Sequence, residues 1–347
     1  MPAEFEKHSA VWLVWPTDDI TFINRLPKAQ EDMAKIIKNI SESEQVELLV
    51  LNEDVKKLAE DMLNKEQANL AKINFHITEY VDVWIRDYGP TFVLNSSTKT
   101  LALVSWGYNA YGKANEWYFE PLDQDAKIPK WMNGYLKLPS FEPGIVLEGG
   151  AIDVNGQGVC LTTQQCLLNP NRNPEMTKER MEKYLGDYLN VKKTIWLKEG
   201  LTNDHTDGHI DEIARFANAT TIVCAFEDDK TDENYPILLD NYNALVAATD
   251  VDGKPFKVIK LPMPHMKYTE EEKIKYEEGD KAPVSYANFY IGNTVVLAPT
   301  FNDPNDEKAM KILQDTFQDR KVIPIACEDL IYGGGVMHCM SQQQPAV

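Results

Sequence analysis

Four segments of the sequence crowd polar, charged or glycine residues beside apolar ones. They are DVWIRDYGP (82–90), LEGGAIDVNG (147–156), NDHTDGHIDEIARF (203–216) and YGGGVMHCMSQQQP (332–345). The last segment holds the most reactive side chain, because Cys339 follows His338 and a run of three glycines that allows the backbone to approach a ligand closely. The alternative is a loose loop with an incidental cysteine. By contrast, Cys160 and Cys224 stand in apolar runs typical of core thiols.

The segment 203–216 supplies a candidate acid/base group. His209 and Asp211 flank one position, so in an extended chain they face the same side. A buried histidine beside carboxylates has a raised pKa, which suits acid/base catalysis. Two alternatives are an exposed acidic turn and a metal site built from His205, Asp207, His209 and Asp211. The metal site is disfavoured because Gly208 interrupts any helix that would align the two histidines, so no metal or other cofactor is expected.

The other two segments add carboxylates. In 82–90, Trp84 and Asp87 are expected on a strand that ends at Gly89 and Pro90, and Glu148 is expected at the end of another strand, before two glycines. Either carboxylate alone would be an ordinary turn or cap residue.

Together the segments describe one kind of site. A nucleophilic cysteine needs a histidine within reach, and that histidine needs an orienting carboxylate. Additional acids suit a cationic substrate, and a guanidinium presents its N–H donors in a planar fork that carboxylates can bind. We therefore expect Asp87 and Asp211 to hold the guanidinium, with Trp84 covering it through a cation–π contact.

The bulk composition agrees with a small cationic substrate. Asp and Glu number 54 against 35 Lys and Arg, a formal net charge of −19 that disfavours nucleic acid and anionic membranes as partners. The same charge is equally explained by solubility alone. No run of apolar residues is long enough to span a membrane, and the N-terminus lacks the pattern of a signal peptide, so a cytoplasmic location is expected. Five cysteines without an export signal make a disulfide framework unexpected.

The positioning elements are expected to be short strands and amphipathic helices of an α/β fold. Strands are predicted at 11–15, 46–51, 92–95, 101–106, 158–163, 194–197, 221–226, 256–261, 294–298 and 322–326. Helices are predicted near 30–40, 54–64 and 233–247, and two more begin at turn signals: one with Asn173 as N-cap and Pro174 as first residue, the other at Asp303 and Pro304. The charged stretch 267–280 predicts a solvated helix or loop. No linker interrupts the chain, so residues 1–347 are expected to form a single catalytic domain.

These motifs, in this order, resemble those of the agmatine deiminase and bacterial peptidylarginine deiminase family over nearly the whole chain. The resemblance begins with MPAEFEKHSAVWLVWP and ends in GGGVMHCMSQQQP. It implies a pentein-type fold, a five-bladed pseudo-symmetric α/β propeller of strand–helix units, and a homodimer. It also implies roles: Cys339 as nucleophile, His209 as general acid/base, Asp87 and Asp211 as guanidinium ligands, Glu148 as the carboxylate that orients His209, and Trp84 and Asn288 near the substrate.

One position departs from the family pattern. Many members carry an acidic residue four places before the catalytic histidine, where this chain has His205. The substitutes for binding the far end of the substrate are Asp82, Asp204 and Asp207.

The predicted function is hydrolysis of agmatine to N-carbamoylputrescine and ammonia through a covalent cysteine intermediate. Free arginine and peptidylarginine are the alternative substrates, and the acidic bias disfavours a substrate carboxylate unless Arg86 pairs with it. Two alternatives from other classes are a metal-dependent hydrolase and a non-catalytic polyamine-binding protein.

Overall fold

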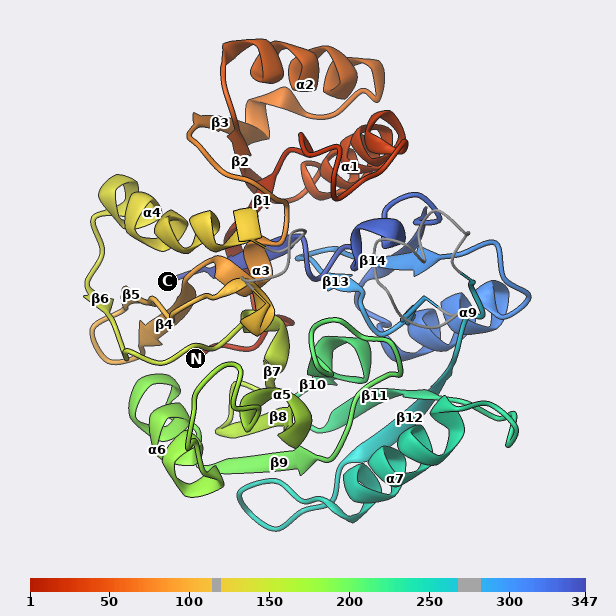
Figure 1. Ribbon diagram of the computed structural model, residues 1–347. Helices are drawn as coiled ribbons and strands as arrows, with labels where there is room; N and C mark the ends of the chain where they lie inside the picture. Colours follow the sequence, from red (N-terminus) through yellow and green to blue (C-terminus); the bar gives the residue numbers. More distant parts are fainter. Residues whose placement is uncertain (114–119, 268–281) are drawn as a thin grey trace.

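The computed structural model describes residues 1–113, 120–267 and 282–347, and these residues form five small sheets around a common centre (Figure 1). The strands are β1 (His8–Val14), β2 (Gln45–Val50), β3 (Ile73–Ile77), β4 (Thr91–Asn95), β5 (Thr100–Val104), β6 (Ser140–Phe141), β7 (Ile152–Val154), β8 (Val159–Thr163), β9 (Lys193–Leu197), β10 (Ala214–Asn218), β11 (Thr221–Phe226), β12 (Lys257–Pro262), β13 (Tyr290–Ile291), β14 (Val295–Thr300), β15 (Lys321–Ala326) and β16 (Ser341–Pro345). The predicted five-bladed α/β propeller is confirmed.

The blades repeat one pairing pattern. In four sheets an antiparallel pair is followed by a parallel one: β4-β5-β6, β7-β8-β9, β10-β11-β12 and β13-β14-β15. The fifth sheet has the order β16-β1-β2-β3, in which β16 is antiparallel to β1 and β1 is parallel to β2. The last strand of the chain therefore completes the first blade and closes the ring.

The longer helices lie toward the outside of the ring, whereas the four-residue helices α3 (Ile85–Tyr88) and α5 (Gln164–Leu167) lie nearer its centre (Figure 1). The longer helices are α1 (Leu26–Ile40), α2 (Glu53–Lys65), α4 (Ile128–Leu136), α6 (Lys178–Leu189), α7 (Asn234–Ala247) and α9 (Asp306–Thr316). The three helices predicted near 30–40, 54–64 and 233–247 are present as α1, α2 and α7. The stretch 267–280 lies outside the described residues apart from Lys267, so its predicted form stays a prediction.

Two predicted helix starts are wrong. Helix α6 begins at Lys178, where the side chain of Thr177 accepts a hydrogen bond from the amide of Arg180. Asn173 instead exchanges two hydrogen bonds with the backbone of Val146, at 2.9 and 2.7 Å, which fixes a loop rather than a helix end. Helix α9 likewise begins at Asp306, after the predicted start.

All ten predicted strands are present, with ends shifted by at most three residues. The sequence did not signal β3, β6, β7, β10, β13 and β16. Some of these are only two or three residues long, and β16 reads SQQQP, a polar run buried because it lies between β1 and the centre of the ring.

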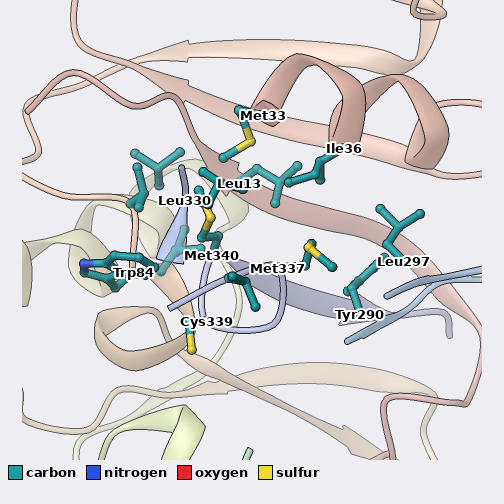
Figure 2. Close-up of a cluster of buried hydrophobic side chains, with 14 of the residues drawn as sticks. Leu13, Met33, Ile36, Trp84, Tyr290, Leu297, Leu330, Met337, Cys339 and Met340 are labelled. Carbon is teal, nitrogen blue, oxygen red and sulfur yellow. The ribbon is translucent and has the colours of Figure 1, made fainter. Parts of the chain in front are cut away.

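The largest hydrophobic cluster lies directly behind the glycine-rich segment. Figure 2 shows Met337 and Met340 on the side of the loop that faces Leu13 of β1 and Met33 of α1, whereas the sulfur of Cys339 points away from this cluster. Apolar contacts therefore anchor the backbone around Cys339 on the side away from the thiol. Among the described residues, no helix combines the length and apolar character needed to cross a membrane.

Candidate active site

Cys339 lies between the 3₁₀ helix η6 (Ile331–Gly333) and β16, at the centre of the ring. The preceding glycines are required by close contacts. Gly334 has φ +106°, and a Cβ there would lie 2.4 Å from His205 Cε1, while a Cβ on Gly335 would lie 3.0 Å from Cys339 Sγ. Larger residues would therefore push the loop away from the thiol.

The thiol of Cys339 is 6% exposed and is surrounded by polar groups. Asn288 Nδ2 donates to Sγ at 3.1 Å, Asp211 Oδ2 lies 3.5 Å away, and Glu212 Oε1 lies 4.0 Å away. Burial, followed by the charges of Asp211 and Glu212, raises the pKa of the Cys339 thiol well above its ordinary value. The raised pKa favours the protonated thiol, and a bound cation would favour the thiolate.

Asp87 lies on a single helical turn, so the predicted strand over 82–90 is wrong. The amide of Asp87 donates to Trp84 O at 3.0 Å and the amide of Gly89 donates to Ile85 O at 2.9 Å, which defines α3. Both carboxylate oxygens of Asp87 accept hydrogen bonds, from the Gly150 amide at 2.9 Å and from the Tyr111 hydroxyl at 3.0 Å. Burial is the main cause that raises the pKa of Asp87 to about 6.

Trp84 precedes this turn and packs against the glycine loop. Its ring atoms would lie 3.0 Å from a Cβ on Gly333 or Gly335, and the residue is buried. The indole therefore stands beside the thiol, as Figure 2 shows.

Asp211 lies in the 3₁₀ helix η5 (Ile210–Glu212), so the expected extended conformation of this segment is wrong. The tight turn brings Asp211 and Glu212 to the same thiol. Asp211 Oδ2 lies 2.7 Å from His338 Nδ1. Burial would raise the pKa of Asp211, but the hydrogen bond and charge of His338 hold that pKa below its ordinary value.

His209 lies between two carboxylates. Its Nδ1 is 3.6 Å from Asp87 Oδ1 and its Nε2 is 4.0 Å from Glu148 Oε2, and neither nitrogen has a hydrogen-bond partner among the described residues. Burial opposes protonation, yet Asp87 and then Cys166 raise the pKa of His209 well above its ordinary value. The raised pKa favours the imidazolium form, which can donate a proton.

Glu148 is not at a strand end, as was predicted, but in extended backbone before the 3₁₀ helix η4 (Gly149–Ala151). Its Oε1 accepts a hydrogen bond from Arg172 Nε at 2.8 Å, and its Oε2 faces His209. The adjacent Gly150 is needed, because a Cβ there would lie 2.6 Å from His209 Nδ1.

The three acidic residues considered for the far end of the substrate bind protein groups. Asp207 pairs with Arg172 and accepts from Asn171 Nδ2. Asp204 accepts from the amide and hydroxyl of Thr206 in its own turn. Asp82 accepts from the Thr21 hydroxyl at 2.6 Å and from the amide of Val83.

His205 borders the glycine loop near the thiol. Its ring contacts Gly334 and lies edge-on to Tyr111, with centroids 5.5 Å apart. Arg86, by contrast, points away from the site, since it donates to His338 O and Gln343 Oε1 and lies 3.5 Å from Glu4 Oε2. These contacts leave Arg86 unsuited to pair with a substrate carboxylate.

Within the described part of the chain, three groups of side chains have possible metal-ligand atoms within 4.8 Å of one another. They are Glu148, Cys166 and His209; Asp211, Glu212 and Cys339; and Glu227, Asp232 and His265. The cluster imagined from the sequence, His205 with Asp207, His209 and Asp211, is not one of them. The geometry therefore gives no support to the metal site considered from the sequence.

Several residues of the site were missed from the sequence. They are Glu4, Tyr111, Cys166, Arg172 and Glu212, while His338 was noticed only as a neighbour of Cys339. A signal existed for Glu212, which directly follows Asp211. Glu4 and Arg172 reach the site only through contacts between distant segments, which no local pattern reveals.

Fold and site together define a pentein-type enzyme with a cysteine, a histidine and carboxylates at the centre of its ring. The chain belongs to the Porphyromonas-type peptidyl-arginine deiminase family, whose model matches residues 1–345. The resemblance seen in the sequence is thereby confirmed, and the chain is a member of a family of hydrolases that act on the C–N bond of a guanidino group.

Three individual relatives have names that specify agmatine and not peptidyl-arginine as the substrate. A putative agmatine deiminase of Streptococcus mutans is 37% identical, over 100% of this chain and 95% of its own length. An agmatine deiminase of Pseudomonas syringae is 36% identical, with the same coverage. The solved agmatine deiminase of Enterococcus faecalis is 32% identical with a TM-score of 0.91, over 100% of this chain and 95% of that one.

Proposed function

We propose that this chain hydrolyses the guanidinium group of agmatine to N-carbamoylputrescine and ammonia, through a covalent intermediate on Cys339. The observation that carries the proposal is the setting of Cys339 Sγ, 3.5 Å from Asp211 and 4.0 Å from Glu212, with His209 and Asp87 alongside. Such an acidic surround suits a cationic carbon and not the oxyanion of acyl transfer. The names of the relatives support agmatine, whose degradation product feeds polyamine synthesis.

Binding of the substrate prepares the nucleophile. Asp87 and Asp211 accept N–H donors of the guanidinium, and Trp84 lies against its face or alkyl chain. The positive charge lowers the pKa of the Cys339 thiol, whose proton is released as the cation docks.

Chemistry then proceeds in two halves. The thiolate forms a C–S bond with the guanidinium carbon, His209 gives its proton to a terminal nitrogen, the C–N bond breaks and ammonia leaves. The remaining amidino-thioether is attacked by water while neutral His209 takes a proton from it. Breakage of the C–S bond restores the thiolate and releases the ureido product in protonated form. This product passes its proton to the ammonia released in the first half, which gives ammonium.

The choice of agmatine over arginine rests on the cations near the site. Arg86 is bound to His338, Gln343 and Glu4, and Arg172 is bound to Glu148 and Asp207. A substrate carboxylate would thus meet acids without a matching cation. The description of the family keeps peptidyl-arginine as the second candidate substrate.

The test is ammonia release from agmatine, free arginine and a blocked arginyl peptide, with wild type and Cys339→Ala side by side. Turnover of agmatine alone, abolished in the variant, is expected, and mass spectrometry of quenched wild type should show the amidino adduct on Cys339. Activity that survives in Cys339→Ala, or that is lost with EDTA, would favour a metal-dependent hydrolase. Tight binding of agmatine without ammonia release would favour a polyamine-binding protein.

We further propose that residues 1–347 act as a single catalytic domain, located in the cytoplasm and assembled as a homodimer. The single domain is supported by the closure of the ring by β16. The cytoplasmic location and the homodimer rest on the expectations drawn from the sequence. Size-exclusion chromatography with light scattering tests the dimer.

A further inference from the structure

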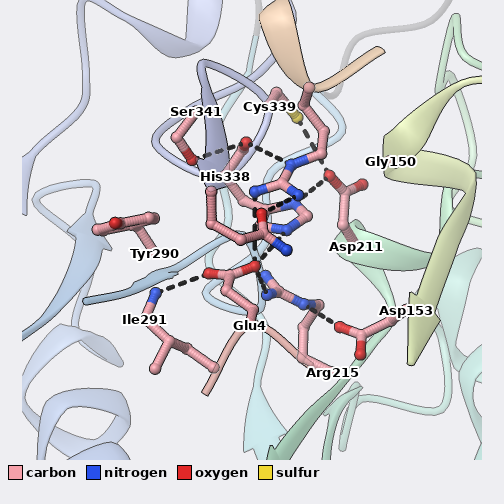
Figure 3. Close-up of polar contacts among 12 residues, drawn as sticks. Glu4, Gly150, Asp153, Asp211, Arg215, Tyr290, Ile291, His338, Cys339 and Ser341 are labelled. Atoms are coloured by element: carbon pink, nitrogen blue, oxygen red, sulfur yellow. Dashed lines mark hydrogen bonds and ion pairs between the residues drawn. The ribbon is translucent and has the colours of Figure 1, made fainter. Parts of the chain in front are cut away.

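The ring of His338 lies between two buried carboxylates. Nδ1 is 2.7 Å from Asp211 Oδ2, and Nε2 is 2.8 Å from Glu4 Oε2 (Figure 3). Glu4 comes from the segment before β1, Asp211 from η5 and His338 from the loop before β16, so the contact joins three distant parts of the chain.

Hydrogen-bond donors decide the charge of this ring. A neutral imidazole donates from one nitrogen, whereas the imidazolium donates from both, and an ionised carboxylate can only accept. Glu4 is ionised, since Arg215 Nη2 donates to its Oε2 at 2.7 Å and the amide of Ile291 donates to its Oε1 at 2.8 Å. With both carboxylates ionised, both contacts of His338 are hydrogen bonds only when each ring nitrogen carries a proton.

The contact also determines which oxygen of Asp211 is available. Oδ2 is taken by His338 and lies beside Cys339 Sγ, whereas Oδ1 is buried and has no hydrogen-bond partner among the described residues. A buried acceptor without a partner is costly, so Oδ1 is suited to an N–H of the substrate.

We propose that His338, held by Glu4, is a positioning residue that keeps Asp211 ionised and its Oδ1 directed to the guanidinium. This proposal deepens the proposed function and rests on it. His338 need not contact the substrate, because it acts through Asp211.

The surroundings make such a partner necessary. The titratable and charged groups packed around Asp211 and His338 are Glu4 of the N-terminal segment, Arg86 and Asp87 of α3, Asp153 of β7, Asp204 and His209 before η5, Glu212 of η5, Arg215 of β10, Tyr290 of β13, and Cys339.

Acids are the nearest neighbours of Asp211 on the substrate side. Without His338, Asp211 would face Asp87 and Glu212 in a buried site with less opposing positive charge, and its pKa would rise. Burial would raise the pKa of Asp211, and His338 is the main cause that holds it below its ordinary value.

The experiment compares His338→Asn with His338→Gln. The Asn amide stands near the position of Nδ1 and can still donate to Asp211, whereas the Gln amide stands near Nε2 and can reach only Glu4. His76→Asn is the matched control, since His76 of β3 pairs with Glu47 in the first blade and belongs to no part of the site. The readout is kcat/KM for agmatine as a function of pH, with thermal unfolding of each variant.

For His338→Gln we expect a loss in kcat/KM of about 10- to 100-fold at pH 7, carried mainly by KM. The acidic limb of the profile should shift to higher pH, because Asp211 must lose its proton before it binds the cation, and activity should recover partly as pH rises. His338→Asn should shift less, and His76→Asn should keep the wild-type profile. Equal losses of kcat/KM in His338→Asn and His338→Gln at every pH, with the acidic limb of the profile unchanged, would overturn the proposal.

A second measurement does not depend on turnover or on the folding of the variants. In ¹⁵N-histidine-labelled wild type at pH 7, the two contacts require that both nitrogens of the His338 ring carry a proton. One unprotonated nitrogen would overturn the proposal even if agmatine is the substrate. Two protonated nitrogens in an enzyme inactive on agmatine would instead refute the proposed function and leave the His338 contact standing.

Discussion

Replacing Asp87 with Asn should make the protein more stable and nearly inactive. The carboxyl group is 3% exposed, and burial is the main cause that raises its pKa to about 6, against about 4 for an unfolded chain. A difference of about 2 pKa units corresponds to about 3 kcal/mol against the carboxylate in the folded state. The native site therefore stores an unfavourable charge that a substrate cation would neutralise.

The sign of this effect sets its pH dependence. Between about pH 4 and 6 the folded state binds more protons at Asp87 than the unfolded state, so stability falls as pH rises through that window. Above about pH 6 the folded state carries the full free-energy cost of the buried Asp87 carboxylate. Asn carries no charge and keeps an acceptor for the Gly150 amide, so we expect a gain of about 1–3 kcal/mol at pH 8, or roughly 2–4 °C in Tm. The gain should vanish near pH 4.

The assay is thermal unfolding of wild type and Asp87→Asn at pH 4.5 and pH 8, paired with ammonia release from agmatine. Loss of the anionic partner of a buried cation should reduce kcat/KM by about 100-fold or more. Glu148→Gln is the contrasting variant, because it removes the negative charge that lies 2.8 Å from the buried Arg172 guanidinium and should lower Tm at both pH values. An Asp87→Asn protein that is less stable than wild type at pH 8, or that turns over normally, would refute the reasoning.

Two further predictions concern the thiol and its loop. Iodoacetamide should alkylate Cys339 slowly at pH 7 and faster as pH rises, because burial and two neighbouring acids raise the pKa of the thiol; rapid labelling at pH 7, measured by mass spectrometry, would contradict this. Gly334→Ala should lose about tenfold or more in kcat, because Gly334 has φ +106° and a Cβ there would lie 2.4 Å from His205 Cε1. Gly186→Ala in helix α6, whose Cβ would meet no atom closer than 3.4 Å, should leave kcat unchanged, and equal effects of the two would speak against the steric argument.

The sequence was sufficient for the buried strands but not for the edges of the blades. Central strands such as β8 and β11 are continuous apolar runs, which any pattern search detects. The first strands of two blades, β7 and β13, have only three and two residues. Strand β16 is polar, and its glutamines bond neighbouring side chains; for example, Trp12 Nε1 of the paired strand β1 donates to Gln344 Oε1 at 3.0 Å. The fivefold repeat was invisible in the sequence because it resides in strand pairing and not in residue identity.

In the candidate site, too, the sequence identified the residues that belong to local motifs and missed those that only the folded ring brings together. The four motifs identified Cys339, His209, Asp87, Asp211 and Glu148, which the structure brings together, although their catalytic roles stay predictions. Local conformation was predicted wrongly at three of these places, because single helical turns leave no periodicity to detect. The supporting charges were missed, since Glu4 lies more than 200 positions from Arg215, its partner, and such pairings exist only in the folded ring.

The closure of the ring by β16 also sets the order in which activity can arise during folding. Trp12 of β1 and Gln344 of β16 are hydrogen-bonded although 332 positions apart, and Cys339 stands two residues before β16. Contacts of such high sequence separation form late. Closing the long loop between them costs conformational entropy, which interactions formed earlier in folding must offset. During synthesis, four blades can fold while the first still lacks its inner strand. The nucleophile and its His338 support are thus assembled at the last step, so that a reactive centre exists only in a chain that has already closed.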